Sequence, residues 1–93
     1  MDSQRQTKKL VITKVIEEKV KKYSIILFND DVNTFEFVIE TLITVCGHEP
    51  LQAEQCAFLV HHKGKCEVKT GEYSKLLPMA EALLDKGLTA EIQ

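Results

Sequence analysis

Three adjacent polar residues, Asn29, Asp30 and Asp31, have the chemistry to hold a positive charge. They directly follow the apolar run at residues 23–28, where a turn would need only one such residue. Amide and carboxylate oxygens are hydrogen-bond acceptors, and the carboxylates add negative charge. Together with His61, the two carboxylates are equally compatible with an acid/base pair or with a site for a cation or an amine.

Other kinds of chemistry find little support in the sequence. It contains no G-x-S-x-G, no Gly-rich phosphate loop and no H-E-x-x-H, so we do not expect an enzyme or a cofactor. His61, His62 and Cys66 are residue types that bind zinc. Adjacent histidines on a helix, however, point about 100° apart and do not readily share one ion, so we expect no metal.

The elements that carry these residues begin with YSIILF at residues 23–28, typical of a central strand with both faces mostly covered. Asn33 and Glu36 then give a capping-box-like start to a helix that ends at Gly47. Apolar residues recur every three or four positions along it, which predicts one inward face formed by Phe35, Val38, Ile39, Leu42, Ile43 and Cys46.

A second helix is predicted from Pro50, which suits the first helical position, to the residues before Gly64. His61 and His62 fall in its last turn, where such groups suit the exposed carbonyls. Its predicted inward residues are Ala53, Cys56, Ala57, Leu59 and Val60.

The rest of the chain alternates strand, helix and strand. KCEVK at residues 65–69 and LTAEI at residues 88–92 both alternate, as strands covered on one face do. Thr70 is the expected cap of a third helix that Gly87 ends, and Pro78 is expected to kink this helix or begin a new first turn. Its apolar residues are Tyr73, Leu76, Leu77, Ala80, Leu83 and Leu84.

This order predicts an α+β fold: a three-stranded antiparallel sheet with three helices packed on one face, in the order β-α-α-β-α-β. Residues 23–93 form the expected core domain. Residues 1–22 are expected to be an N-terminal arm that is at least partly mobile, with the structure of residues 10–22 left open.

Composition limits the classes of partner. The net charge is -2 and no coherent basic face is apparent, so we expect no nucleic-acid partner. No apolar run reaches the length of about 18 residues that a membrane span needs, and residues 1–10 are polar. We expect a cytoplasmic protein with no membrane association, whose cysteines at positions 46, 56 and 66 are free buried thiols.

The combined motifs resemble one known family. FNDDVNTFEFV followed by AFLVHHKGK is similar to the core of the ClpS adaptors, with their Asn-Asp-Asp turn, Thr-Pro-Met helix start and Val-His-x-x-Gly helix end. The resemblance covers Tyr23 to roughly Ile92. It implies an adaptor that binds substrates through an N-terminal Leu, Phe, Tyr or Trp and delivers them to a Clp-type AAA+ unfoldase, similar to ClpA or ClpC. We expect a monomer.

The resemblance also implies roles for individual residues. Asn29, Asp31 and His61 would accept hydrogen bonds from the substrate's α-amine, His61 either directly or through water, while Asp30 shapes the turn and adds negative charge. The pocket for the first side chain would be lined by Asn33, Phe35, Val38, Ala57, Val60 and Leu88.

The sequence departs from the family pattern in three places. Asn33-Thr34-Phe35 replaces Thr-Pro-Met, and Ala57 stands where a second Met is common. These changes act in opposite directions on pocket size, so the ranking of first residues stays open, and even Ile or Val could be admitted. The unfoldase-docking run, usually Thr-x-Glu-x-Ala-Glu-x-Lys, keeps Thr70 and Glu72 but has Lys75 and Leu77 at its second acidic and its basic position.

Two alternatives follow. The chain could be a ClpS-like interaction domain whose divergent pocket serves another ligand or another unfoldase. The same α+β order is also similar to the C-terminal domain of the ribosomal stalk protein, an interaction module in which Asn29, Asp31 and His61 need not converge.

Overall fold

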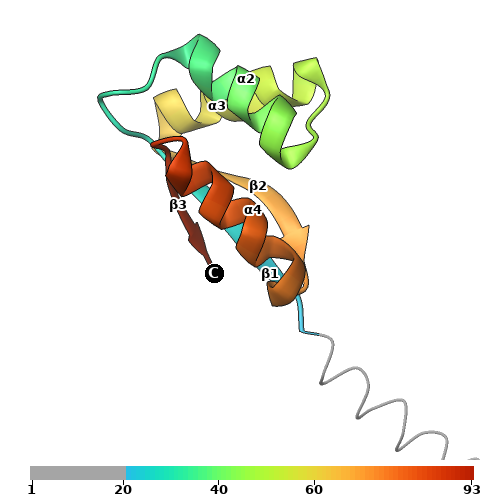
Figure 1. Ribbon diagram of the computed structural model, residues 1–93. Helices are drawn as coiled ribbons and strands as arrows, with labels where there is room; N and C mark the ends of the chain where they lie inside the picture. Colours follow the sequence, from blue (N-terminus) through green and yellow to red (C-terminus); the bar gives the residue numbers. More distant parts are fainter. Residues whose placement is uncertain (1–20) are drawn as a thin grey trace, which may run out of the picture.

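Three strands and three helices make up residues 21–93, the part of the chain that the computed structural model describes (Figure 1). Their order confirms the predicted α+β fold. The predicted mobile arm falls, apart from Lys21 and Lys22, outside the described residues. The elements are β1 (Tyr23–Phe28), α2 (Phe35–Cys46), α3 (Pro50–Lys63), β2 (Lys65–Gly71), α4 (Tyr73–Asp85) and β3 (Thr89–Ile92).

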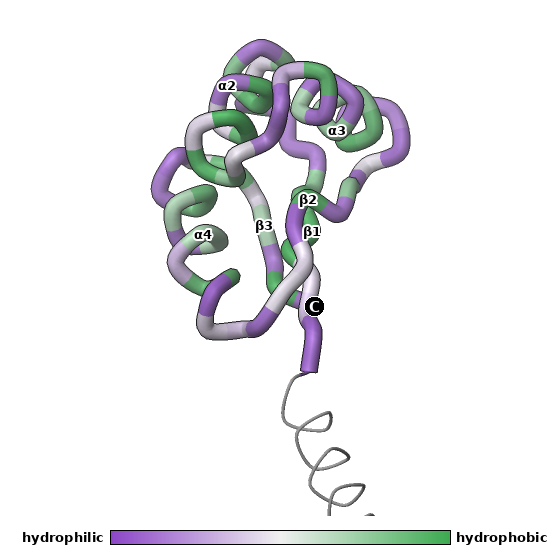
Figure 2. Tube along the Cα trace, turned by 90° about the vertical axis from the view of Figure 1, so that its right-hand side faces the viewer, coloured by the Kyte–Doolittle hydropathy of each residue, from purple (hydrophilic) through white to green (hydrophobic). Residues whose placement is uncertain are grey.

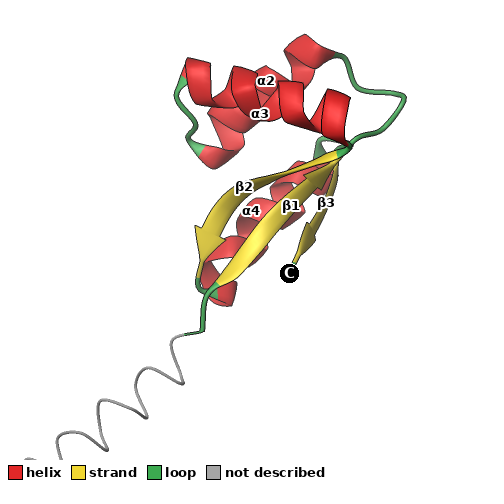
Figure 3. Cartoon of the chain, turned by 180° about the vertical axis from the view of Figure 1, so that it is seen from behind, coloured by secondary structure: helices red, strands yellow, loops and turns green. Residues whose placement is uncertain are grey.

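The strand β1 is central in the sheet and pairs antiparallel with β2 on one side and β3 on the other. Seen from behind in Figure 3, α4 lies behind the sheet, and α2 and α3 lie across the end where β1 stops. Ile25 and Leu27 are buried, whereas Ser24, Ile26 and Phe28 on the other face are half-buried. The central strand therefore has one covered face and one half-buried face, whereas the sequence predicted two mostly covered faces.

One hydrophobic core joins the covered face of the sheet to all three helices. Figure 2 shows α4 running along the sheet while α2 and α3 close its end. The predicted inward face of each helix is too wide, because a surface helix buries only a stripe and the neighbouring positions reach solvent. Exposed positions of this kind are Phe35 on α2, Leu59 on α3, and Tyr73, Leu77 and Leu84 on α4.

Two predicted helix caps are wrong. Thr34, not Asn33, caps α2, and its Oγ1 accepts a hydrogen bond of 3.1 Å from the N–H of Phe37. The strand β2 runs on to Gly71 because Thr70 pairs with Ser24 in the sheet, so Thr70 does not cap α4. The helix α4 begins instead after Glu72, and it continues through Pro78 to Asp85 as one element.

A β-bulge in β2 creates a buried polar contact. The consecutive residues Ile25 and Ile26 pair with Lys69 and Glu67, which leaves Val68 as an extra residue without a partner on β1. The ring of His48, which is buried, lies 2.7 Å through Nε2 from the carbonyl oxygen of Val68. Because a carbonyl can only accept, Nε2 carries the proton and donates it. Among the described residues, Nδ1 has no hydrogen-bond partner.

We expect the substitution His48→Leu to lower the free energy of unfolding by about 1–3 kcal/mol, because the carbonyl of Val68 would stay buried without a donor. Urea denaturation of the two proteins measures this difference. The matched control is His62→Leu at an exposed histidine of α3, where we expect a change within about 0.5 kcal/mol. Equal stability of His48→Leu and the parent chain would show that the bulge does not need this hydrogen bond.

The three cysteines are free, as predicted; Cys46 and Cys56 are buried and Cys66 is half-buried. Burial raises the pKa of the Cys46 thiol to about 11. Burial, together with the neighbouring Cys66, also raises the pKa of Cys56. Both thiols are therefore protonated at neutral pH. No helix among residues 21–93 has the length and apolar character needed to cross a membrane.

Candidate functional site

The turn that follows β1 is organised by Asp30. Its Oδ1 accepts hydrogen bonds from the backbone N–H groups of Val32 at 2.9 Å and Asn33 at 2.8 Å. Its Oδ2 accepts a third, of 2.8 Å, from Nδ2 of Asn33. The Asp30 carboxylate is thus committed to the turn, and this leaves Asp31 as the carboxylate of the pair that faces solvent.

Two longer-range hydrogen bonds fix the position of this turn. The backbone N–H of Asn29 donates to the carbonyl of Gly64 at 2.9 Å, which ties the end of β1 to the end of α3. On the other side, Nδ2 of Asn33 donates to the carbonyl of Gly87 at 2.9 Å, which ties the turn to the segment before β3. The turn therefore lies where α3, α2 and the start of β3 meet.

Two small cavities lie at this meeting point, each of about 20 Å³. They share the walls Asn29, Asn33, Val38 and Val60. A volume of this size holds about one water molecule. One cavity is completed by Leu27, Phe28, Asp30 and Leu88, and the other by Phe35, Ala57 and His61.

The predicted pocket residues come together in the structure, because all six line one cavity or both. Ala57, Val60 and Leu88 are buried walls, while Phe35, 36% exposed, stands at the surface. Leu27 and Phe28 also line a cavity and were not predicted. Their place directly before Asn29 at the end of β1 is the signal that could have identified them.

The predicted amine ligands do not all occupy the same position. Asn29 and His61 are exposed and line a common cavity. Asp31 is also exposed, but it lines neither cavity. The His61 ring meets the His62 ring edge-on at 5.0 Å between centroids, and His62 in turn lies against Phe58 at 4.1 Å. The two histidines therefore face different surroundings: His61 the cavity, and His62 the outer side of α3.

The arrangement combines apolar walls with acceptor groups at the rim. Val38, Val60 and Leu88 offer no hydrogen-bonding groups in their side chains, whereas the amide oxygen of Asn29 and a neutral His61 each offer an acceptor. Such a site suits a ligand with one apolar end and one donor-rich, positively charged end. Within residues 21–93, no group of three or more His, Cys, Asp or Glu side chains is arranged to hold a metal ion.

The hydrogen bonds of Asp30 predict a pH-dependent contribution to stability. The backbone N–H of Asn33, with the Asn33 amide and the Val32 N–H, outweighs partial burial and lowers the pKa of Asp30. As the pH falls, the unfolded chain is therefore protonated at this position first. The contribution of Asp30 is complete above its ordinary pKa of about 3.9 and is lost as the pH falls through the lowered pKa of the folded state.

We accordingly expect Asp30→Ala to lower the free energy of unfolding by about 1–2 kcal/mol near neutral pH, since the turn loses its acceptor. The difference from the parent chain should shrink in acid. Urea denaturation across a pH series measures both effects. Asp31→Ala, at the neighbouring carboxylate, is the control, with an expected change within about 0.5 kcal/mol. A difference that persists unchanged in acid would contradict this role of Asp30.

The residues expected to dock the unfoldase are all exposed. Thr70 lies near the end of β2, Glu72 immediately before α4, and Lys75 in the first turn of that helix. Glu72 stands at the N-cap of α4, but its side chain makes no capping hydrogen bond there.

Several known proteins are similar to this chain in sequence or in fold. The family model described as ATP-dependent Clp protease adaptor protein ClpS matches residues 18–91. A protein of Acetivibrio thermocellus, named ATP-dependent Clp protease adapter protein ClpS, is 38% identical over 79 residues, which cover 85% of this chain and 78% of the relative. A protein of the same name from Clostridium acetobutylicum is 51% identical over 47 residues, which cover 50% of this chain and about half of the relative, 46%.

Among solved structures, the chain is similar to Agrobacterium tumefaciens ClpS2 bound to L-phenylalaninamide. The TM-score is 0.72 at 26% sequence identity, and the match covers 78% of this chain and 95% of that one. The family model spans nearly all of the described residues, and the Acetivibrio relative is matched over more than two thirds of its length. The chain therefore belongs to the ClpS family of ATP-dependent Clp protease adaptors.

Proposed function

We propose that this chain binds the free N-terminus of proteins that begin with a bulky apolar residue and delivers them to a Clp-type AAA+ unfoldase. The observation that carries the proposal is the pair of adjoining cavities with apolar walls and with Asn29 and His61 at the rim. In this role the chain acts by binding and not as an enzyme, and it uses neither a cofactor nor a metal.

The chemistry of an N-terminus fits the rim of this site. An α-ammonium group has three N–H donors and a positive charge, and it needs several fixed acceptors when it is partly removed from water. The Asn29 amide oxygen and a neutral His61 ring supply two acceptors. Asp31 supplies the charge, since the Asp30 carboxylate is occupied by Val32 and Asn33.

The first side chain of the substrate would enter the cavities. Their walls of Val38, Ala57, Val60 and Leu88 favour apolar groups. The structural neighbour ClpS2 has bound L-phenylalaninamide, a ligand with a free amine and a benzyl group. This supports Phe, and with it Leu, Tyr and Trp, as first residues.

The cavities must widen to accept such a side chain, because about 20 Å³ in each is the room of one water molecule. Phe35 is the wall best placed to move. It is 36% exposed, it stands at the first position of α2, and it borders open space on its outer side. We therefore assign Phe35 the role of gate to the pocket.

The proposed partner is an unfoldase similar to ClpA or ClpC, docked through the exposed Thr70, Glu72 and Lys75. Lys75 carries the opposite charge from the acidic residue usual at that position of the family. The partner's surface should then be more acidic there. We propose that the chain acts as a monomer in the cytoplasm.

Fluorescence anisotropy with short labelled peptides tests the proposal. The peptides begin with Phe, Leu, Tyr, Trp, Ile or Val, and each is made with a free and with an acetylated N-terminus. The proposal requires binding at about micromolar concentration or below for free Phe, Leu, Tyr or Trp peptides, and none for their acetylated forms. If no free peptide binds, the domain is instead an interaction module with a divergent pocket.

The two adjacent histidines provide a matched pair of variants. We expect His61→Ala to weaken binding of a free Phe peptide by about tenfold, since one acceptor of the amine is lost. His62→Ala should change the affinity by less than about twofold, because His62 faces Phe58 and not the cavity. Anisotropy titrations of both variants measure these changes in affinity. Equal losses in the two variants, or none in His61→Ala, would contradict the assignment of His61.

A further inference from the structure

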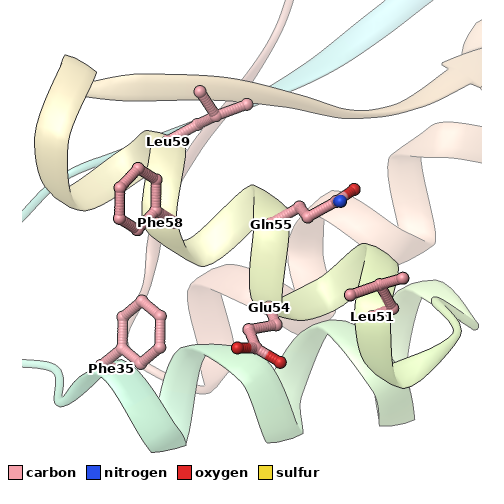
Figure 4. Close-up of a pocket in the computed structure, with 6 residues that line it drawn as sticks. All are labelled: Phe35, Leu51, Glu54, Gln55, Phe58 and Leu59. Atoms are coloured by element: carbon pink, nitrogen blue, oxygen red, sulfur yellow. The ribbon is translucent and has the colours of Figure 1, made fainter.

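A larger apolar groove lies beside the proposed site and has no role in it so far. It measures about 460 Å³ and is formed by the first residue of α2 and one side of α3. Figure 4 shows Phe35 of α2 and Phe58 of α3 facing each other across it. Its lining residues are Phe35, Leu51, Glu54, Gln55, Phe58 and Leu59.

The groove gathers several of the large apolar side chains that the fold leaves in solvent. Leu51 is 65% exposed, Phe58 54% and Leu59 42%. None of the three is needed by the inward face of α3, which is formed by Ala53, Cys56, Ala57 and Val60. A contiguous apolar surface of this kind, rather than scattered single residues, is typical of a binding site.

Phe35 connects this groove with the proposed amine site, because it lines both the groove and the cavity of His61. A peptide that starts at His61 and passes Phe35 therefore enters the groove. Along α3, Phe58 lies about 4.5 Å and Leu51 about 15 Å from His61, at a rise of about 1.5 Å per residue. The groove thus covers the path of the residues that follow the substrate's N-terminus.

The periodicity of an extended peptide determines which substrate residue places its side chain in the groove. Successive side chains point to opposite sides and each residue advances about 3.3 Å, so the first and third side chains point the same way and lie about 7 Å apart. When the first side chain is in the cavity, the third meets the groove between Phe58 and Leu51. The second side chain points to solvent.

We propose that this groove binds an apolar side chain at the third position of the substrate, so that the chain recognises a bulky first residue together with a Leu-like or Phe-like third residue. The inference rests on the proposed function. Glu54 lines the groove, so an acidic third residue meets a like charge and is disfavoured.

Anisotropy with three free peptides tests the inference: Phe-Ala-Leu-Ala-Gly, Phe-Ala-Ser-Ala-Gly and Phe-Ala-Asp-Ala-Gly, each labelled at an added C-terminal lysine. We expect the Leu peptide to bind about tenfold more tightly than the Ser peptide, and the Asp peptide to bind most weakly. In Leu51→Ser the ratio between the Leu and Ser peptides should fall below about threefold. The control Leu84→Ser, at a similarly exposed leucine of α4, should keep the full ratio.

The outcomes separate this inference from the proposed function. Equal binding of the Leu and Ser peptides, with no binding of their acetylated forms, overturns the proposed role of the groove and leaves amine recognition intact. A ratio that survives Leu51→Ser also overturns it. If the Leu and Ser peptides bind equally and sedimentation shows a dimer that Leu51→Ser dissolves, the groove binds a second copy of the chain. If no free peptide binds at all, both proposals fail.

Discussion

Replacing Asp31 with alanine is expected to weaken the binding of a free Phe peptide about hundredfold, one of the two largest effects that we predict. Asp31 lies in the turn beside the cavities, and among residues 21–93 its carboxylate makes no hydrogen bond that would commit it to the fold. Truncating one partner of a hydrogen-bonded charge pair that is buried typically costs about 2–5 kcal/mol, and about 1.4 kcal/mol is a factor of ten. The expected loss assumes that the bound substrate covers the pair formed by Asp31 and the amine. Anisotropy titration of the variant measures the loss.

The matched control for this variant is Glu81→Ala, which removes an exposed carboxylate from α4 and should leave the affinity unchanged. Both variants should keep the parent's circular dichroism spectrum. Unfolding of Asp31→Ala would show that this carboxylate is structural. Binding at the parent's affinity by a folded Asp31→Ala would show that the amine's charge is met elsewhere.

The second large effect concerns the gate. We expect Phe35→Ala to strengthen the binding of a free Val peptide by about tenfold or more relative to a free Leu peptide. A β-branched residue is widest next to its α-carbon, which is the part that sits at the mouth of the pocket. Phe35 crowds the mouth, and its removal connects the cavity of about 20 Å³ with the groove of about 460 Å³.

Selectivity between the Val and Leu peptides, measured by anisotropy, gives the result directly. Tyr73→Ala, at an exposed aromatic residue of α4, is the control and should leave the selectivity unchanged. An acetylated Val peptide should fail to bind Phe35→Ala, since the amine site is still required. An unchanged ratio in Phe35→Ala would mean that the pocket opens without displacing this ring.

The order of elements and most of the core could be predicted from the sequence, because local signals determine both. Alternation in residues 65–69 and 88–92, and helical spacing after Phe35, each report one buried face. The predicted helix ends at Gly47 and Gly64 are also confirmed, because the left-handed conformation that ends a helix favours glycine.

What the sequence could not predict depends on contacts between distant segments. Asn33 is a good N-cap by type, but its amide is held by Asp30 and by the carbonyl of Gly87, so Thr34 takes that role. Thr70 belongs to the sheet because Ser24 pairs with it. The contact of His48 with the bulge at Val68 leaves no local signal in the sequence at all.

The candidate site was predicted through the resemblance, and its neighbouring groove was missed. The motif places Asn29 and His61 in one site, and the hydrogen bond between Asn29 and Gly64 brings them to one cavity. The groove was missed because Leu59 was assigned to the core. Leu51 and Phe58, outside the inward face of α3, were the signal of an additional apolar surface.

The geometry of the turn explains why two carboxylates and an amide follow the central strand. Asn29 ties the strand to α3 through its backbone and keeps its side chain for the rim of the cavity. Asp30 builds the turn with three hydrogen bonds. Under the proposed function, Asp31 supplies the negative charge for the amine, because the carboxylate of Asp30 is already used to build the turn.

The most direct test of the amine-binding proposal is an NMR titration of the isotope-labelled chain with L-phenylalaninamide and, separately, with its N-acetylated form. We predict that L-phenylalaninamide shifts the side-chain amide signals of Asn29 and the imidazole signals of His61, while His62 changes little and the acetylated compound has no effect. Shifts that are equal for both compounds, or that spare Asn29 and His61, would contradict recognition of an N-terminal amine at this site.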